Sequence, residues 1–196
     1  IRGNLEELNP DIPIISRLDN TVPYSKRRNW NHFWLVDPLD SNAGLLATGE
    51  DFTINIALIE DRRPVLGIIH APVKNIIYYS MNSKDAFRIE AGKKQEIIEA
   101  HANREQKLPT HTGREGTSHQ KKMDESTQPA SIALAMCLTA EGKIDTTISL
   151  DGTKEWETAG AHAVIKATGM KLVNADSNSE LSYNKEDFQN GLLILK

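Results

Sequence analysis

Residues 33–40, FWLVDPLD, decide how the rest of this chain is to be interpreted. An apolar run suited to a buried strand ends at Asp37 and Asp40, which stand three positions apart with Pro38 between them. Proline fixes its own φ and cannot donate to a strand ladder, so we expect the chain to turn here. The turn can bring the two carboxylates together beside the carbonyl of Leu39.

A pair of carboxylates held this close has two interpretations. Like charges repel unless a cation or a proton lies between them, and hard oxygen ligands favour Mg²⁺. The alternative is an ordinary strand end followed by a turn in which an aspartate binds nearby backbone. Two aspartates three positions apart favour the second interpretation when taken alone, so the surrounding sequence has to decide between them.

The surrounding sequence predicts a run of short strands with brief connections, which is typical of an antiparallel meander. Residues 52–59 alternate apolar positions with Thr53 and Asn55, as a half-buried strand does. Two helices, at 130–141 and 157–168, are each followed by a glycine that can end a helix. The other expected strands are residues 12–16, 33–37, 65–70, 76–80, 86–90, 95–99, 171–174 and 191–195. We therefore expect a layered α/β (α+β) sandwich.

Composition narrows the class of protein. The 196 residues suit a single domain. The formal net charge is −4 and the sequence contains no basic stripe, so we do not expect nucleic acid as a partner. Cys137 is the only cysteine, so no internal disulfide can form and a cytoplasmic location is expected. No apolar run approaches the roughly 20 residues of an integral membrane segment. Residues 100–128 are mostly polar and predict a mobile insert.

The order of the motifs resembles a known family. FWLVDPLD is followed by FTINIALI at 52–59, PVLGII at 64–69 and EWETAGAHA at 155–163. This set resembles the inositol monophosphatase-like family of metal-dependent phosphatases, and within it the bacterial 3'(2'),5'-bisphosphate nucleotidases of sulfur metabolism. The resemblance runs from about Pro10 to the C-terminus. It implies the family's layered fold, incomplete at the N-terminus, because the family's first helical segment is almost absent here.

The resemblance also implies a reaction and a set of metal ligands. The family hydrolyses phosphate monoesters with Mg²⁺, and the implied substrate is a small phosphorylated nucleotide, adenosine 3',5'-bisphosphate, which would give AMP and phosphate. Asp37 would bridge two metal ions, the Leu39 carbonyl would bind one, and Asp40 would bind the other. Glu157 stands where the family has an aspartate ligand. It could instead complement the positive N-terminus of its helix.

Three further positions depart from the family pattern. Ser41 and Asn42 stand where a Gly-Thr pair receives the substrate phosphate, and both are good helix caps, so an anion site can survive. Asn42 also occupies the catalytic position of a threonine that activates water, although an amide cannot take that proton. Arg17 replaces a metal-ligating glutamate. Its positive charge opposes a cation there and can hold the phosphate directly.

These departures leave alternatives to the nucleotidase. One is a catalytically impaired relative that binds a nucleotide, a phosphate or a partner on the same scaffold. Another is inositol monophosphatase activity, and a third is a truncated or altered family member. The family resemblance alone implies, beside the cytoplasmic location, a peripheral association with the inner membrane. Outside the motifs, the histidines show no metal-ligand spacing, and we expect His162 on the surface of its helix.

Overall fold

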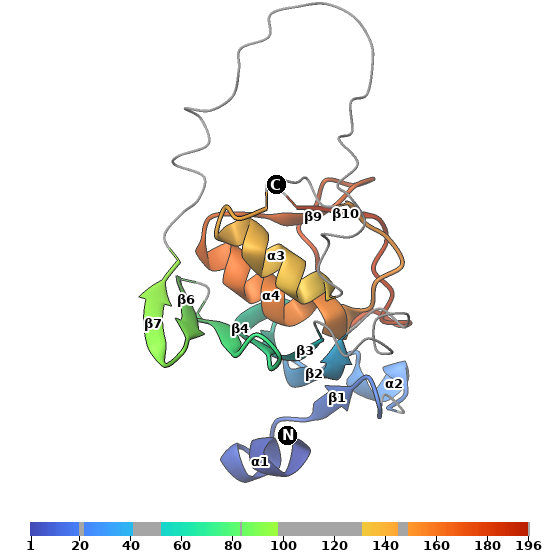
Figure 1. Cartoon of the computed structure of the whole chain (residues 1–196). Coiled ribbons are helices and arrows are strands. Elements are labelled where there is room, and N and C mark those ends of the chain that lie inside the picture. The colour runs from blue at the N-terminus through green and yellow to red at the C-terminus, as the bar shows by residue number, and fades with distance from the viewer. Residues whose placement is uncertain (20–21, 41–51, 83, 98–130, 145–148, 196) are drawn as a thin grey trace, which may run out of the picture.

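Figure 1 shows a large sheet, a pair of helices and a small sheet stacked in that order. The expected insert at about 100–128 lies outside the described residues, as do Ser41 and Asn42. The computed structural model describes residues 1–19, 22–40, 52–82, 84–97, 131–144 and 149–195.

The large sheet confirms the predicted meander. Its seven strands lie in sequence order, and every neighbouring pair from β2 to β7 is antiparallel, whereas β1 pairs with β2 in parallel. The strands are β1 (Ile14–Ser16), β2 (His32–Asp40), β3 (Thr53–Glu60), β4 (Arg63–Ala71), β5 (Ile76–Met81), β6 (Asp85–Glu90) and β7 (Lys93–Glu96).

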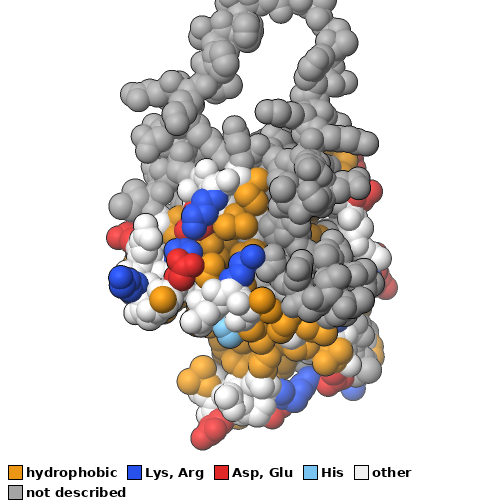
Figure 2. Space-filling view, in the orientation of Figure 1, with side chains coloured by type: hydrophobic (Ala, Val, Ile, Leu, Met, Phe, Trp, Pro, Cys, Tyr) orange, Lys and Arg blue, Asp and Glu red, His pale blue; other side chains and the backbone are white. Residues whose placement is uncertain are grey.

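Side chains alternate between the two faces of this sheet. In β3, Ala57 and Ile59 are buried in the main core with the helices, whereas Ile56 and Leu58 are half-buried on the other face. The second face contributes to a smaller cluster that includes one residue of the short helix α1 (Arg2–Leu8). Figure 2 shows apolar side chains gathered in the region where Figure 1 places β1 and β2.

The helix layer consists of α3 (Ile132–Ala140) and α4 (Glu155–Ala167), close to the predicted ranges. The Ser131 hydroxyl accepts the Leu134 N–H at 3.1 Å and caps α3. A four-residue helix, α2 (Tyr24–Arg27), precedes β2. No helix among the described residues is both long and apolar enough to span a bilayer.

The small sheet closes the stack on the far side of the helices. Its strands are β8 (Ser149–Leu150), β9 (Leu172–Asn174) and β10 (Leu193–Leu195), and β10 lies between the other two in antiparallel pairing. The sequence predicts β9 and β10, but β8 is only two residues long and gives no pattern of its own.

The expectation that His162 lies on a helix surface is wrong. Its side chain is buried, with Nδ1 2.9 Å from the hydroxyl oxygen of Tyr183 and Nε2 3.6 Å from a carboxylate oxygen of Glu180. Both partners lie in the segment between β9 and β10, so this segment covers a position of α4 that would otherwise face water. Burial lowers the pKa of His162, so the ring is neutral at neutral pH.

The backbone of α4 approaches the large sheet directly at two glycines. A Cβ added to Gly67 of β4 would lie 2.0 Å from the carbonyl oxygen of Gly160 and 2.8 Å from the Cβ of Ala163. Only a residue without a side chain fits at this contact. The glycine pair therefore sets the distance between α4, which carries Glu157, and the sheet, which carries Asp37.

Candidate metal centre

Strand β2 passes through Pro38 and ends at Asp40, so the predicted turn at the proline is replaced by a bulge. The register with β3 pairs Asp37 with Asn55 and Asp40 with Thr53, which places two residues of β2 opposite one residue of β3. A bulge leaves a residue outside the ladder, and this accommodates a proline that has no N–H to donate. The expected strand end is therefore corrected by three residues.

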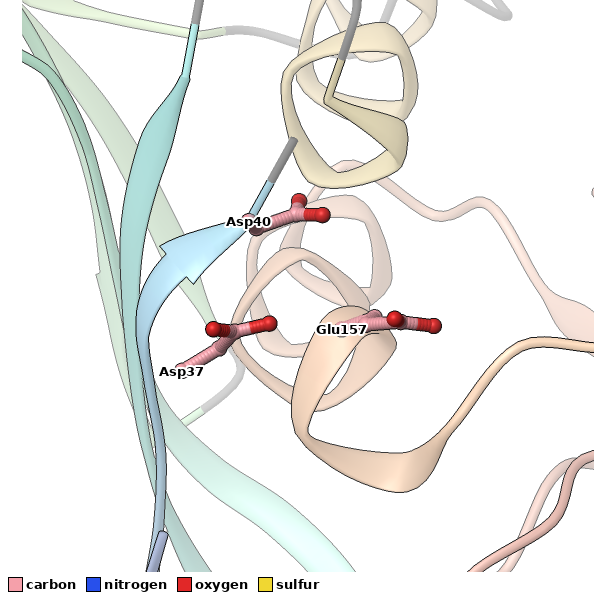
Figure 3. A group of neighbouring side chains, drawn as sticks. All are labelled: Asp37, Asp40 and Glu157. Atoms are coloured by element: carbon pink, nitrogen blue, oxygen red, sulfur yellow. The ribbon is translucent and has the colours of Figure 1, made fainter. Parts of the chain in front are cut away.

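The bulge places both aspartates on the face that meets the helices. Phe33 and Leu35 belong to the main core, and the two-residue period of the strand puts Asp37 on the same side. Without an extra residue, Asp40 would point to the opposite face. Figure 3 shows both carboxylates on the side of β2 that faces α4.

Glu157, in the first turn of α4, completes a cluster of three carboxylates (Figure 3). One oxygen from each of Asp37, Asp40 and Glu157 lies within 4.8 Å of the others. The two aspartates are buried and Glu157 is half-buried. The structure thus brings together the three acidic side chains that the sequence nominates as metal ligands.

The described residues hold Asp40 through a single oxygen. Its Oδ2 accepts hydrogen bonds from Ser131 Oγ at 2.7 Å, Asn55 Nδ2 at 3.1 Å, Thr53 Oγ1 at 3.3 Å and the Ala133 N–H at 3.5 Å. Burial raises the pKa of Asp40, and these donors oppose that rise. The donors fix the orientation of the carboxylate toward the cluster.

Asp37 carries an unsatisfied buried oxygen. Its Oδ1 accepts the Leu39 N–H at 3.1 Å, whereas Oδ2 has no hydrogen-bond partner among the described residues. Burial raises the pKa of Asp37 to about 6, the negative charge of Asp40 adds to the rise, and Arg17 opposes it. A buried anionic oxygen without a partner is costly, and a bound cation removes that cost.

Glu157 caps its own helix and also belongs to the acidic cluster. Its Oε2 accepts the backbone N–H of Lys154 at 2.7 Å, which caps α4, while the same carboxylate lies within reach of the two aspartates. Burial raises the pKa of Glu157, and the charges of Asp40 and Asp37 add to that rise. The helix start is therefore part of the cluster.

Arg17 lies against two of the groups predicted to bind metal. Its Nη1 donates to the Leu39 carbonyl oxygen at 2.5 Å and lies 3.6 Å from Asp37 Oδ1. The side chain is 41% exposed. The roles of Arg17, Ser41 and Asn42 toward the substrate stay predictions.

The residues that support Asp40 are not indicated by the sequence motifs. Thr53 and Asn55 form the polar side of the alternation in β3, yet this is the side buried against the helices. Two polar residues next to Ala57 and Ile59 on a core-facing side are a signal in retrospect, because buried polar groups need partners. Ser131 gives only the signal of a helix cap.

The donor set fits a hard divalent cation. Three carboxylates converge, and one buried oxygen lacks a partner among the described residues. Mg²⁺ takes oxygen ligands, is commonly held by one or two carboxylates and keeps several waters, so three protein oxygens are sufficient. Asp37, Asp40 and Glu157 are the residues that can hold it.

We expect the metal-free protein to gain stability as the pH falls from about 7.5 to about 5.5. The pKa of Asp37 is raised from 3.8 to about 6, so the folded state takes up a proton before the unfolded chain does. This contribution is complete below the unfolded pKa and is lost as the pH rises through about 6. The whole shift of the Asp37 pKa corresponds to about 3 kcal/mol, of which about 1 kcal/mol develops between about pH 7.5 and pH 5.5.

Urea unfolding with a chelator present, at several pH values across this interval, measures the effect. Subtracting the same series for Asp37→Asn isolates the Asp37 contribution from other titrating groups. A wild type whose free energy of unfolding does not rise relative to that of Asp37→Asn as the pH falls would contradict the prediction.

Comparison with known proteins agrees with the sequence resemblance. The model of the inositol monophosphatase family matches residues 1–194, so the match begins before Pro10. The 3'(2'),5'-bisphosphate nucleotidase CysQ of Salmonella typhimurium is 36% identical over 176 residues, which cover 86% of this chain and 69% of that protein. The CysQ of Haemophilus influenzae is 30% identical over 193 residues, covering 93% and 70%.

Solved structures share the fold. CysQ from Bacteroides thetaiotaomicron, described as a bacterial member of the inositol monophosphatase family, has a TM-score of 0.72 at 26% identity and covers 97% of this chain and 78% of its own. Inositol monophosphatase II from Staphylococcus aureus has a TM-score of 0.71 at 14% identity, covering 99% and 72%. The predicted layered α/β fold is confirmed, and the chain belongs to the inositol monophosphatase family.

Proposed function

We propose that this chain is a Mg²⁺-dependent phosphatase that removes the 3'-phosphate of adenosine 3',5'-bisphosphate, giving AMP and phosphate. The observation that carries the proposal is the cluster of Asp37, Asp40 and Glu157, in which a buried oxygen of Asp37 has no hydrogen-bond partner among the described residues. Relatives named as 3'(2'),5'-bisphosphate nucleotidases at 30–36% identity support a small phosphorylated nucleotide as the substrate.

Each residue of the cluster has a physical task in this reaction. Asp37, Asp40 and Glu157 would hold Mg²⁺, which when bound supplies neutralisation of phosphate charge and activation of the attacking water. The donors on Asp40 keep that carboxylate in one orientation, so it does not have to reorganise when substrate arrives. Ser41 and Asn42 would face the phosphate.

Arg17 has a task as well. Its guanidinium lies beside Asp37 with 41% of the side chain exposed, so its positive charge is open to an incoming anion. A permanent charge at the mouth of an anionic cluster favours the approach of a phosphate. Arg17 would contact a phosphate oxygen with the part of its guanidinium that does not bind Leu39.

A second candidate is a module that binds the nucleotide without hydrolysing it. The contact of Arg17 with Leu39 and Asp37 favours this candidate, because it occupies groups that the family resemblance assigns to a metal ion. The two candidates share a ligand and differ in turnover.

The test is phosphate release from adenosine 3',5'-bisphosphate, with Mg²⁺ or with a chelator, and chromatography of the nucleotide product. We expect Mg²⁺-dependent release that yields AMP, and we expect Asp40→Asn to lower kcat by about 100-fold or more. Asp176→Asn is the matched control, because Asp176 is an exposed aspartate remote from the cluster in sequence and absent from its contacts.

The other outcomes separate the alternatives. Binding of the nucleotide in calorimetry without phosphate release favours the binding module. Faster release from inositol 1-phosphate than from the bisphosphate favours inositol monophosphatase activity. A protein that neither binds nor hydrolyses either compound would refute the proposal.

A further inference from the structure

Arg17 is fixed beside Asp37 by its backbone as well as by its side chain. Strand β1 pairs in parallel with β2 and aligns Ser16 with Val36. The Arg17 N–H then donates to the Val36 carbonyl at 3.0 Å, directly before Asp37. The sheet register therefore places Arg17 next to Asp37, within reach of its side chain.

The guanidinium uses a position that a metal ion would need. Its Nη1 is 2.5 Å from the Leu39 carbonyl oxygen and 3.6 Å from Asp37 Oδ1. A Mg²⁺ bound to that carbonyl on the same side would lie about 2.0–2.1 Å from the oxygen, which overlaps the nitrogen. Arginine and a metal ion therefore exclude each other on this side of Asp37.

The other side of Asp37 is arranged for one ion. Among the described residues, Asp37 is bound through Oδ1, Asp40 through Oδ2 and Glu157 through Oε2. Each carboxylate thus keeps a second oxygen for a shared ligand, and the three side chains offer oxygens within 4.8 Å of one another. Asp37 Oδ2 is buried and has no hydrogen-bond partner among the described residues, so it is available to such a ligand.

The charge of the cluster leads to the same number of ions. Three ionised carboxylates and one guanidinium leave two negative charges among these residues, and one divalent ion balances them. A second divalent ion would leave an excess of positive charge next to the Arg17 guanidinium, which is unfavourable at short range.

We propose that Arg17 takes the place of one metal ion, so that the centre binds a single divalent cation between Asp37, Asp40 and Glu157. The guanidinium on Leu39 and Asp37 supplies the second positive charge permanently. This inference rests on the proposed function for the choice of Mg²⁺, and it concerns the number of ions and not turnover.

The test counts Mn²⁺, used in place of Mg²⁺, by equilibrium dialysis and by electron paramagnetic resonance on the metal-free full chain. We expect one tightly bound ion in the wild type and two in Arg17→Glu, which restores a carboxylate and removes the guanidinium. Two ions that share Asp37 lie about 3.5–4 Å apart and give a spin-coupled spectrum, which an adventitious surface ion does not.

Arg17→Gln is the matched variant, because it removes the positive charge without adding a carboxylate. We expect it to keep one tight ion and to bind that ion about 10-fold more strongly, since a nearby positive charge no longer opposes it. If circular dichroism shows that Arg17→Glu does not fold, the affinity of Arg17→Gln for Mn²⁺ tests the inference in its place. Unchanged or weaker binding in folded Arg17→Gln would overturn the inference.

The remaining outcomes are equally decisive. A wild type that binds two coupled ions, or none, overturns the inference, as does a folded Arg17→Glu that binds only one. One ion in the wild type and two in Arg17→Glu, without phosphate release from either, would refute the proposed function and support this inference. Two ions in the wild type together with Mg²⁺-dependent release would do the reverse.

Discussion

Asp37→Asn is expected to weaken divalent-ion binding by at least about 100-fold and to stabilise the metal-free protein at the same time. Binding falls because the substitution removes one of three carboxylates, including a buried oxygen that has no partner in the described part of the chain. An amide can offer only a neutral carbonyl oxygen, and Oδ1 is already committed to the Leu39 N–H. The remaining acids, Asp40 and Glu157, leave a site with two carboxylates and one negative charge fewer to hold the ion.

The stability of the metal-free protein rises for the same structural reason. Asparagine has the shape of aspartate, so its oxygen keeps the Leu39 N–H, while its amide nitrogen can donate to the carboxylates of Asp40 or Glu157. The substitution removes a buried anion whose pKa is raised to about 6 by burial and by a neighbouring carboxylate. The gain is about 1–2 kcal/mol at neutral pH.

Two measurements on one protein check this pair of effects. Calorimetry gives the affinity for Mn²⁺, and urea unfolding with a chelator present gives the free energy of unfolding. Asp176→Asn, at an exposed carboxylate outside the cluster, should change neither. An Asp37→Asn protein that binds the ion as the wild type does, or that is less stable without metal, would show that Asp37 does not serve as a ligand held at a cost in stability.

Gly67→Ala is expected to destabilise the protein by about 3 kcal/mol or more, the largest effect we expect on folding. The added methyl would lie 2.0 Å from the Gly160 carbonyl oxygen and 2.8 Å from the Cβ of Ala163. The first of these atoms is helix backbone, which cannot rotate away as a side chain can. The whole of α4 must lift from β4, or the strand must bend.

A second effect follows from the same displacement. Because α4 carries Glu157 and the sheet carries Asp37, a helix that lifts from the sheet separates the two carboxylates. We therefore expect Gly67→Ala to weaken Mn²⁺ binding by about 10-fold or more, although Gly67 contacts no ligand.

Gly3→Ala is the matched control for both effects. Nothing lies within 4 Å of a Cβ at Gly3, which is in α1, and the same loss of unfolded-chain freedom accompanies both substitutions. Urea unfolding should show that Gly3→Ala is neutral or slightly stabilising. If Gly67→Ala unfolds at the same urea concentration as Gly3→Ala, the close approach of helix and strand does not limit stability.

Much of the large sheet could be predicted from the sequence because its pairings are local. Each strand from β2 to β7 pairs with the next strand along the chain, so short apolar segments with brief connections contain the information needed. The small sheet is different. Its two-residue strand β8 is defined by pairing with β10, which lies more than forty positions later, and no local pattern reports that contact.

The acidic cluster could be predicted as a set of residues but not as a geometry. The sequence motifs bring Asp37, Asp40 and Glu157 together, but the bulge depends on how β2 pairs with β3. Arg17 contacts Asp37 because β1 runs parallel to β2, which a meander pattern does not indicate. The burial of His162 depends on Glu180 and Tyr183, which lie later in the chain between β9 and β10, so helix periodicity alone cannot predict it.

The bulge in β2 also explains why the spacing between Asp37 and Asp40 is an odd number of residues. Along an uninterrupted strand, two side chains share a face only when their separation is even, because the direction alternates with every residue. Asp37 and Asp40 are separated by three positions and still share a face. An odd spacing between two residues on one face therefore indicates one inserted residue between them. The parity of ligand spacing can therefore reveal a backbone irregularity before any coordinates exist. It also shows that the number of residues between the two aspartates, here Pro38 and Leu39, determines the face on which Asp40 lies, whatever the identity of those residues.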